Sequence, residues 1–304
     1  MLANLQIMVV LFLIVVVGYV AGKRGYIDEP FSKRLSAIIV DITCPALILS
    51  SVMGDRLPDS TLILPLLGVG TLTYLILIPL SLLLPRFITH DPEARGIFGF
   101  CITYGNVGFI GYPVAASLFG PEAVFYAALL NVPNTFFVFV HGTYLINSGH
   151  DAKAFNPKIL YSTPMLAAYI SIIIVAAGWA DIPHVVSQPL SILGDVTIPG
   201  ALLIIGASMS RLSIRQIIGG PAVYIVSALR LAAVPLAMYG LFTLIGFDPL
   251  VVNINTVIIA MPVATYGTIL CLRYNRDVTL MTETTFITTL LSIFSIPLIT
   301  LLFG

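Results

Sequence analysis

Charged residues are scarce in this chain. Lys, Arg, Asp and Glu make up 9% of the 304 residues, whereas hydrophobic residues make up 58%. A soluble domain ordinarily carries about 25% charged residues, so this composition excludes a typical soluble globular protein. The formal net charge is zero and by itself implies nothing about partners. We expect a membrane protein of this kind to have no nucleic-acid partner.

Cysteines and catalytic motifs are also few. The three cysteines, Cys44, Cys101 and Cys271, all fall in apolar runs without metal-ligand spacing, which predicts small buried side chains and no metal site. No phosphate-binding loop is present, so ATP is not the direct energy source. The signatures of intramembrane aspartyl proteases, Tyr-Asp and Gly-x-Gly-Asp, are absent around Asp41 and Asp195. The chain is therefore predicted not to be an enzyme and to hold no cofactor.

Apolar runs of about 20 residues recur along the chain, the length that a helix needs to cross roughly 30 Å of hydrocarbon. The first run has no basic residues before it and no cleavage pattern after it, so it is interpreted as a span and not as a signal peptide. Lipid admits only helices and closed barrels, and these runs are apolar on every face. They predict an all-α polytopic membrane protein with ten helices, at residues 3–22, 33–53, 61–84, 96–118, 121–147, 158–180, 188–210, 220–246, 252–272 and 279–303.

The basic residues predict how these helices are oriented. Twelve of the 14 Lys and Arg residues fall in the odd-numbered links, only Arg56 falls in an even-numbered link, and the tails hold none. Because cytoplasmic loops are enriched in Lys and Arg, the odd links are expected to face the cytoplasm. Both termini are then extracytoplasmic, in the cytoplasmic (inner) membrane.

The two halves of the chain share motifs. Asp41 and Asp195 each begin the pattern Asp-x-Thr-x-Pro, in the second and seventh helices. Asn106 and Pro113 in the fourth helix match Asn255 and Pro262 in the ninth, and each proline is followed by Val-Ala. Each match joins helix n to helix n+5, which crosses the membrane in the opposite direction. Residues 1–150 and 151–304 are therefore predicted to be inverted five-helix repeats, an architecture of many secondary transporters.

Glycine, asparagine and proline interrupt the fourth helix in the stretch GNVGFIGYPVA, which begins at Gly105. Proline breaks or kinks a helix, and broken helices at membrane depth are tolerated where they line a cavity. Exposed N–H groups of half-helices, together with asparagine amides, would suit a carboxylate. The alternative is that these glycines and prolines serve helix packing only.

Five stretches resemble the auxin efflux carrier family, which includes plant PIN-FORMED carriers and bacterial malonate-type transporters. They are GNVGFIGYP, NPKILYSTP, LSILGDVTIP, LRLAAVP and IIAMPVATYG, and the resemblance covers essentially the whole chain. The long hydrophilic loop of the large plant members is absent. The resemblance implies inverted repeats like those of bile-acid symporters and sodium/proton antiporters, in which the broken fourth and ninth helices cross.

The resemblance also implies domains and a site. Helices 1, 2, 6 and 7 would form a scaffold that can dimerise, and helices 3–5 and 8–10 would form an elevator-like transport domain. The family motif implies that Asn106 and Pro113 touch the substrate carboxylate at the crossing, with Pro262 opposite. Asn156 and Pro157 match the entry to the sixth helix. Further substrate-binding candidates are Gly105, Asn255 (by internal symmetry), Thr265 and Tyr266.

Ionisable residues within spans are expensive and indicate function. Asp195 and its repeat mate Asp41 are candidates for coupling through H+ or Na+, or alternatively bond to nearby scaffold groups. Arg230, in the eighth helix, either neutralises the substrate anion or pairs with an aspartate. His141, in the fifth helix, either titrates or makes a polar contact within the bundle.

The sequence as a whole predicts a secondary transporter of a small organic anion, such as a carboxylate or dicarboxylate, embedded in the lipid bilayer. The family resemblance implies that it is a homodimer. The alternative is a cation/proton antiporter of similar fold, which would need acidic pairs beside the crossing. This chain has asparagines there.

Overall fold

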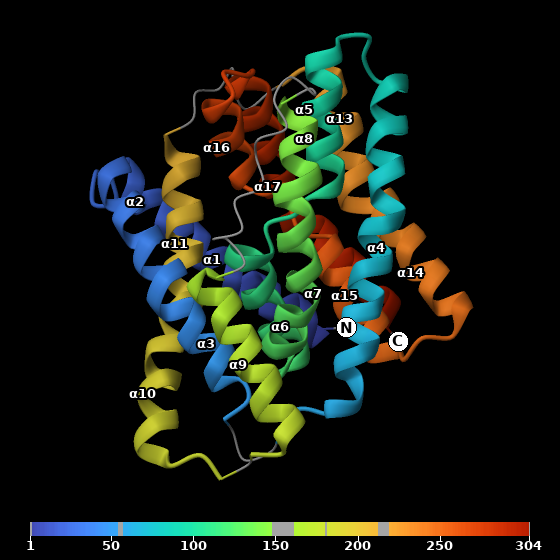
Figure 1. Ribbon diagram of the computed structural model, residues 1–304. Helices are drawn as coiled ribbons and strands as arrows, with labels where there is room; N and C mark the ends of the chain where they lie inside the picture. The colour runs from blue at the N-terminus through green and yellow to red at the C-terminus, as the bar shows by residue number, and fades with distance from the viewer. Residues whose placement is uncertain (1, 54–56, 148–160, 180, 212–218, 304) are drawn as a thin grey trace. The chain divides into compact units, whose positions relative to one another are not determined.

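Helices are the main secondary structure of the residues that the computed structural model describes (Figure 1). These residues are 2–53, 57–147, 161–179, 181–211 and 219–303, and their side chains are described from residue 9 onward except at 272–273. These residues form two compact units. The first unit comprises Met1–Leu66, Gly108–Val132 and Lys158–Leu212, and the second comprises Leu67–Val107, Pro133–Pro157 and Ser213–Gly304. The boundaries between the units fall within the third, fourth and fifth predicted helices. The division into scaffold and transport domains stays a prediction.

Close backbone packing joins two helices of the first unit, α1 (Leu2–Lys23) and α11 (Thr197–Ser210), which lie side by side in Figure 1. Gly18 of α1 lies so close to α11 that a Cβ atom there would fall 2.8 Å from the Leu203 Cα. A Cβ atom at Gly206 of α11 would overlap backbone atoms of Val15 and fall 2.6 Å from the Tyr19 amide nitrogen. Small residues are therefore what allows these two helices to touch.

The short helix α3 (Cys44–Ser50) packs between α9 (Thr163–Ala177) and α10 (His184–Asp195) in the same unit. Gly194 provides the contact with α10, since a Cβ atom there would lie 2.8 Å from the Leu47 Cα. The chain reaches α3 through α2 (Glu29–Ile38), which Asp28 caps by accepting a hydrogen bond from the Phe31 N–H at 2.8 Å. The unit is completed by α6 (Tyr112–Phe119) and the first part of α7 (Ala123–Phe137).

Prolines in several helices are preceded by a turn of π-helix. The π-turns η1 (Ile39–Thr43), η4 (Val107–Gly111) and η7 (Leu229–Ala233) lie just before Pro45, Pro113 and Pro235. Proline has no N–H, and its ring clashes with the carbonyl four residues earlier. A wider turn relieves this clash: the N–H of Cys44 bonds to the Ile39 carbonyl, and that of Val234 to the Leu229 carbonyl, five residues back. These prolines therefore widen their helices without interrupting them.

The second unit contains the interrupted segments. It comprises most of α4 (Ile63–Leu83), α5 (Pro92–Thr103), α8 (Thr143–Asn147), α13 (Pro221–Ala228), α14 (Val234–Ile245), α15 (Pro249–Ile259), α16 (Tyr266–Arg273) and α17 (Val278–Thr300). Among these, α13 packs on α17, α14 on α15, and α5 on α8. Asp91 and Asp248 cap the first turns of α5 and α15 by accepting backbone hydrogen bonds. Phe98, Phe100 and Phe242 are fully buried in this unit's core.

Every predicted helix corresponds to helical residues in the structure. Among the described residues, five helical runs are long and apolar enough to cross a membrane: Ser60–Phe87, Ala123–Asn147, His184–Ser210, Pro221–Ile245 and Val278–Phe303. The same residues also contain four shorter apolar helices, Val9–Lys23, Val107–Phe119, Thr163–Ala177 and Pro249–Ile259. Asn156, Pro157 and the first residues of the predicted helix 158–180 lie outside the described residues. The prediction of a multi-pass helical membrane protein is confirmed at this level.

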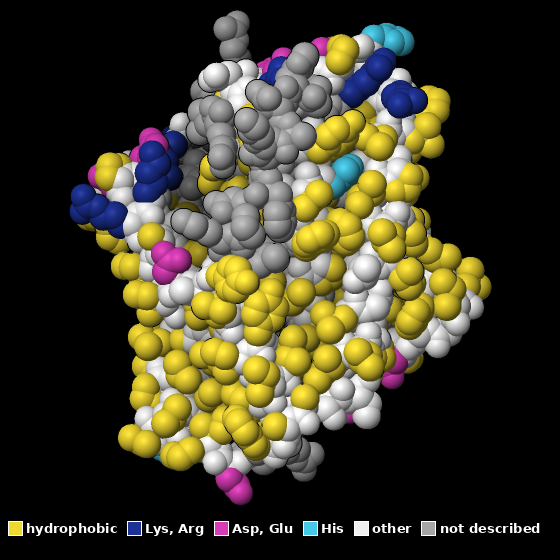
Figure 2. Space-filling model, in the orientation of Figure 1, with side chains coloured by type: hydrophobic (Ala, Val, Ile, Leu, Met, Phe, Trp, Pro, Cys, Tyr) yellow, Lys and Arg dark blue, Asp and Glu magenta, His cyan; other side chains and the backbone are white. Residues whose placement is uncertain are grey.

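Large hydrophobic side chains are exposed along these helices, and they cover much of the face shown in Figure 2. Val185 on α10 and Leu244 on α14 are 80% and 88% exposed. Contiguous apolar surface of this kind is what lipid chains cover, and it would be costly in water.

Candidate functional site

Two interrupted helices meet through their backbones in the second unit. After α5 ends at Thr103, residues Tyr104–Asn106 run extended, and after α15 ends at Ile259 the chain is irregular until α16 begins at Tyr266. The N–H of Asn106 donates to the Pro262 carbonyl at 2.8 Å, and the N–H of Ala264 donates to the Tyr104 carbonyl at 3.0 Å. Gly105 and Val263 thereby form an antiparallel bridge. We call residues Tyr104–Asn106 and Pro262–Ala264 the crossing.

The two prolines occupy different positions with respect to these interruptions. Pro262 lies within the crossing, as the sequence predicted. Pro113 does not: it lies in the first turn of α6, beyond the π-turn η4, and the fourth helix is interrupted earlier, at Tyr104–Asn106. The π-turn η4 and α6 form one continuous helical run, Val107–Phe119, and the wider turn before Pro113 accommodates the proline ring without breaking this run. The prediction that Pro113 marks the break is therefore wrong.

The Arg230 guanidinium lies against backbone carbonyls beside the crossing. Its side chain is 1% exposed. Its Nε donates to the Met261 carbonyl at 2.8 Å, and its Nη1 donates to the Ile102 and Thr103 carbonyls at 3.1 and 2.9 Å. The last carbonyls of a helix lack intrahelical donors and carry partial negative charge, so the guanidinium satisfies and neutralises them. The sequence-based alternative of an aspartate partner is wrong for the described residues, because no carboxylate there pairs with Arg230.

Gly105 leaves the space that the guanidinium fills. A Cβ atom at residue 105 would overlap Nη2 of Arg230, and it would lie 3.1 Å from Cζ and 3.2 Å from the Met261 carbonyl oxygen. At Gly108, three residues later in the same motif, a Cβ atom would meet nothing within 4 Å. The two glycines of GNVG are therefore inequivalent: only Gly105 is required by close packing.

Thr288 of α17 also supports the crossing through a hydrogen bond to its backbone. Its hydroxyl accepts a hydrogen bond from the Val263 N–H at 3.2 Å and donates to the Thr284 carbonyl at 2.8 Å. The motifs of the sequence did not point to Thr288, although the density of threonine in 279–289 is a signal that could have done so.

Tyr104 links the crossing to a buried polar chain that the sequence motifs also did not predict. Its ring stacks on Tyr74, with ring centroids 5.9 Å apart. Its hydroxyl lies 2.9 Å from Nδ1 of His141 and 3.0 Å from the Phe137 carbonyl oxygen. The other ring nitrogen of His141 lies 3.4 Å from the Ser81 hydroxyl. Of the alternatives for His141, the structure shows the polar contact within the bundle.

Asn255, Thr265 and Tyr266 have different surroundings. Asn255 is 2% exposed, lies inside α15, and exchanges hydrogen bonds with Thr73 of α4 at 3.2 and 3.4 Å. Its amide therefore joins two helices, and it does not lie in the crossing as Asn106 does. Thr265 is exposed, and Tyr266 is partly buried with its ring edge-to-face against Phe139.

Asp41 and Asp195 lie in the first unit, both exposed and both at helix irregularities. Asp41 falls in the π-turn η1 and accepts a hydrogen bond from the Thr163 hydroxyl at 3.4 Å, and Asp195 is the last residue of α10. The threonines of the two Asp-x-Thr-x-Pro motifs meet: the buried Thr197 hydroxyl donates to that of Thr43 at 2.9 Å. The repeated motif therefore marks a direct contact between its two copies.

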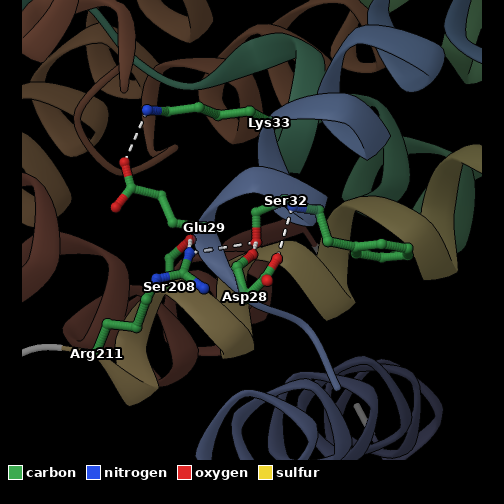
Figure 3. Close-up of polar contacts among 7 residues, drawn as sticks. Asp28, Glu29, Ser32, Lys33, Ser208 and Arg211 are labelled. Atoms are coloured by element: carbon green, nitrogen blue, oxygen red, sulfur yellow. Dashed lines mark hydrogen bonds and ion pairs between the residues drawn. The ribbon is translucent and has the colours of Figure 1, made fainter. Parts of the chain in front are cut away.

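A second polar cluster ties the start of α2 to the end of α11 (Figure 3). Arg211 donates to the Ile27 carbonyl and to the hydroxyls of Ser32 and Ser208, each at 3.2 Å. Beside it, Lys33 pairs with Glu29 at 2.7 Å and lowers the pKa of that carboxylate. This cluster fixes the ends of helices in the first unit and uses basic residues from two of the links predicted to be cytoplasmic.

Sequence comparison identifies the family. Two segments, residues 5–159 and 152–300, match a family described as membrane transport protein. The chain belongs to this family. The resemblance to auxin efflux carriers is thereby confirmed, and the protein is a membrane transporter and not an enzyme. Because two successive segments match, the comparison also supports an internal repeat.

Relatives extend over nearly the whole chain. An "Uncharacterized transporter" of Methanocaldococcus jannaschii is 27% identical over 97% of each chain. Another "Uncharacterized transporter", of Methanothermobacter thermautotrophicus, is 23% identical over 94% of this chain and 93% of its own. A Rhizobium meliloti protein named "Putative malonate transporter" is 24% identical over 93% of this chain and 90% of its own.

Proposed function

We propose that this transporter is a secondary carrier of small organic anions, with malonate and similar dicarboxylates as the substrate class. The observation that carries the proposal is the crossing, where two interrupted apolar helices pair through their backbones around a buried guanidinium. Irregular backbone in the hydrocarbon region is tolerated only where protein or a water-filled cavity surrounds it, which makes such breaks typical of substrate sites. The name of the Rhizobium meliloti relative supports the same substrate class.

The fold that we propose for this function is the finer one expected from the sequence. It has ten transmembrane helices in two inverted five-helix repeats, at residues 1–150 and 151–304, with helices 4 and 9 crossed. Helices 1, 2, 6 and 7 form a scaffold that dimerises, and helices 3–5 and 8–10 move as an elevator. The carrier resides in the cytoplasmic membrane with both termini outside.

Three features at the crossing favour an anion as cargo. Arg230 supplies a buried positive charge, and Asn106 is 7% exposed within the extended segment. The half-helix α16 begins at Tyr266, directly after the crossing, so its first N–H groups and positive dipole end lie there. Among the described residues, the crossing itself contains no Asp or Glu, which disfavours a cation/proton antiporter.

Uptake of radiolabelled malonate into proteoliposomes tests this function. Wild-type protein should accumulate malonate, and succinate and other small dicarboxylates should compete. Asn106→Ala should abolish uptake while leaving a folded, monodisperse protein, because it removes the amide at the crossing. Gln188→Ala, which deletes an exposed amide of α10, is the matched control and should transport normally. Full uptake by Asn106→Ala would reject this site, and no uptake of any small carboxylate by the wild type would reject the function.

A further inference from the structure

Three backbone carbonyls converge at the crossing in a way that suits a cation. Ile102 and Thr103 are the last two residues of α5, and Met261 follows the end of α15. Both helices therefore direct their negative ends, with carbonyls that lack intrahelical donors, toward one point in the second unit. Unwound carbonyls at half-helix C-termini are the groups with which carriers built from broken helices hold monovalent metal ions.

Arg230 fills that point. Its Nε and Nη1 together satisfy all three carbonyls at 2.8–3.1 Å, and the side chain is 1% exposed. Its Nη2 lies beside Gly105, and no described residue accepts a hydrogen bond from it. The guanidinium thus has two N–H groups left over after it has neutralised the helix ends.

We propose that the Arg230 guanidinium is a built-in cation. It occupies the position at which two helix C-termini would otherwise hold a metal ion, and its Nη2 binds the carboxylate of the cargo. This proposal rests on the proposed anion transport. It follows that the crossing carries a permanent positive charge and needs no Na+, and that removal of the side chain creates a site for an external cation.

The first test needs no substitution. Malonate uptake by the wild type should be the same when Na+ is replaced by K+ or by choline on both sides of the membrane. Uptake that requires Na+ would overturn the proposal, because the crossing would then need an external cation in addition to Arg230.

The second test removes the guanidinium and supplies it again from solution. Arg230→Ala should lower malonate uptake about tenfold or more, since the loss of one charge-assisted hydrogen bond to the cargo carboxylate already lowers its affinity by about that factor. Millimolar guanidinium should raise the Tm of this variant by about 2 °C or more relative to tetramethylammonium at equal ionic strength. The wild type and Arg24→Ala, which removes an exposed arginine, should show no such gain. Equal shifts in all three proteins, or none in Arg230→Ala, would contradict the proposal.

Two conservative variants keep the test decisive if Arg230→Ala does not fold. Arg230→Lys keeps the positive charge and should retain part of the malonate uptake without Na+. Arg230→Met keeps a long side chain without the charge, and its malonate uptake should be lost. Full uptake by Arg230→Met in the absence of added cation would overturn the proposal. The Tm measurements need no substrate, so they remain informative even if malonate is not the cargo.

Discussion

The contrast between Gly105 and Gly108 gives a stringent prediction of stability. In Gly105→Ala the new methyl group would overlap Nη2 of Arg230 and lie 3.2 Å from the Met261 carbonyl oxygen. Overpacking of this kind costs about 1–3 kcal/mol. Displacement of the guanidinium would add about 1.5–3 kcal/mol for each hydrogen bond to a charged group that is lost. With one such bond lost, we expect a total loss of about 2.5–6 kcal/mol, which lowers Tm by roughly 5–15 °C for a chain of this size.

A thiol-reactive fluorogenic dye can follow this unfolding in detergent, because Cys44, Cys101 and Cys271 are all buried and react only when the helices separate. Gly108→Ala is the matched control. Its methyl group meets nothing within 4 Å, and alanine is the better helix former, so Tm should stay the same or rise slightly. Equal Tm values for the two alanine variants would refute the tight packing of Arg230 against Gly105.

Other substitutions test the first unit. Gly206→Ala should cost about 1–3 kcal/mol, because its methyl group meets backbone of α1 and not a flexible side chain, whereas Gly240→Ala, with open space around it, should be neutral in thermal unfolding. Thr197→Val should lower Tm through loss of the 2.9 Å bond to Thr43, at a cost of about 1 kcal/mol, and the double variant with Thr43→Val should cost less than the sum of the single variants. Hydrogen bonds from the hydroxyl and N–H of Thr61 hold the pKa of Asp59 below its ordinary 3.8. The carboxylate therefore contributes stability near neutral pH, and this contribution is lost as the pH falls through the folded-state pKa. Asp59→Asn should reduce the decrease of Tm at acid pH.

The helices and the existence of two interruptions could be predicted from sequence because they depend on local properties. Apolar run length determines where a helix can span lipid, and the repeated Asp-x-Thr-x-Pro motif correctly joined two segments whose threonines now form a hydrogen bond. Pro262 likewise lies in the irregular segment that it predicted.

The position of the other interruption could not be predicted, because proline has two effects that look identical in sequence. It can end a helix, or it can be accommodated after a π-turn inside a continuous helical run, as Pro45 and Pro113 are. The matching of Asn106 with Asn255 failed for a related reason. The bridge pairs Gly105 with Val263, so the shared spacing of Asn and Pro aligns residues that lie at different points of the two breaks.

The hydrogen-bond partners of Arg230 could not be predicted from the sequence either. A buried arginine suggests a carboxylate or an anion, because those are side-chain or ligand groups that a sequence reveals. Backbone carbonyls at the ends of two separate helices become acceptors only when the fold brings those ends together.

Equilibrium binding of malonate to the purified protein, measured by isothermal titration calorimetry, tests the central claim most directly. The wild type should bind malonate saturably, other small dicarboxylates should displace it, and folded Asn106→Ala should bind none. A folded wild-type protein that binds no small carboxylate, or an Asn106→Ala variant that binds malonate as tightly as the wild type, would contradict a carboxylate site at the crossing.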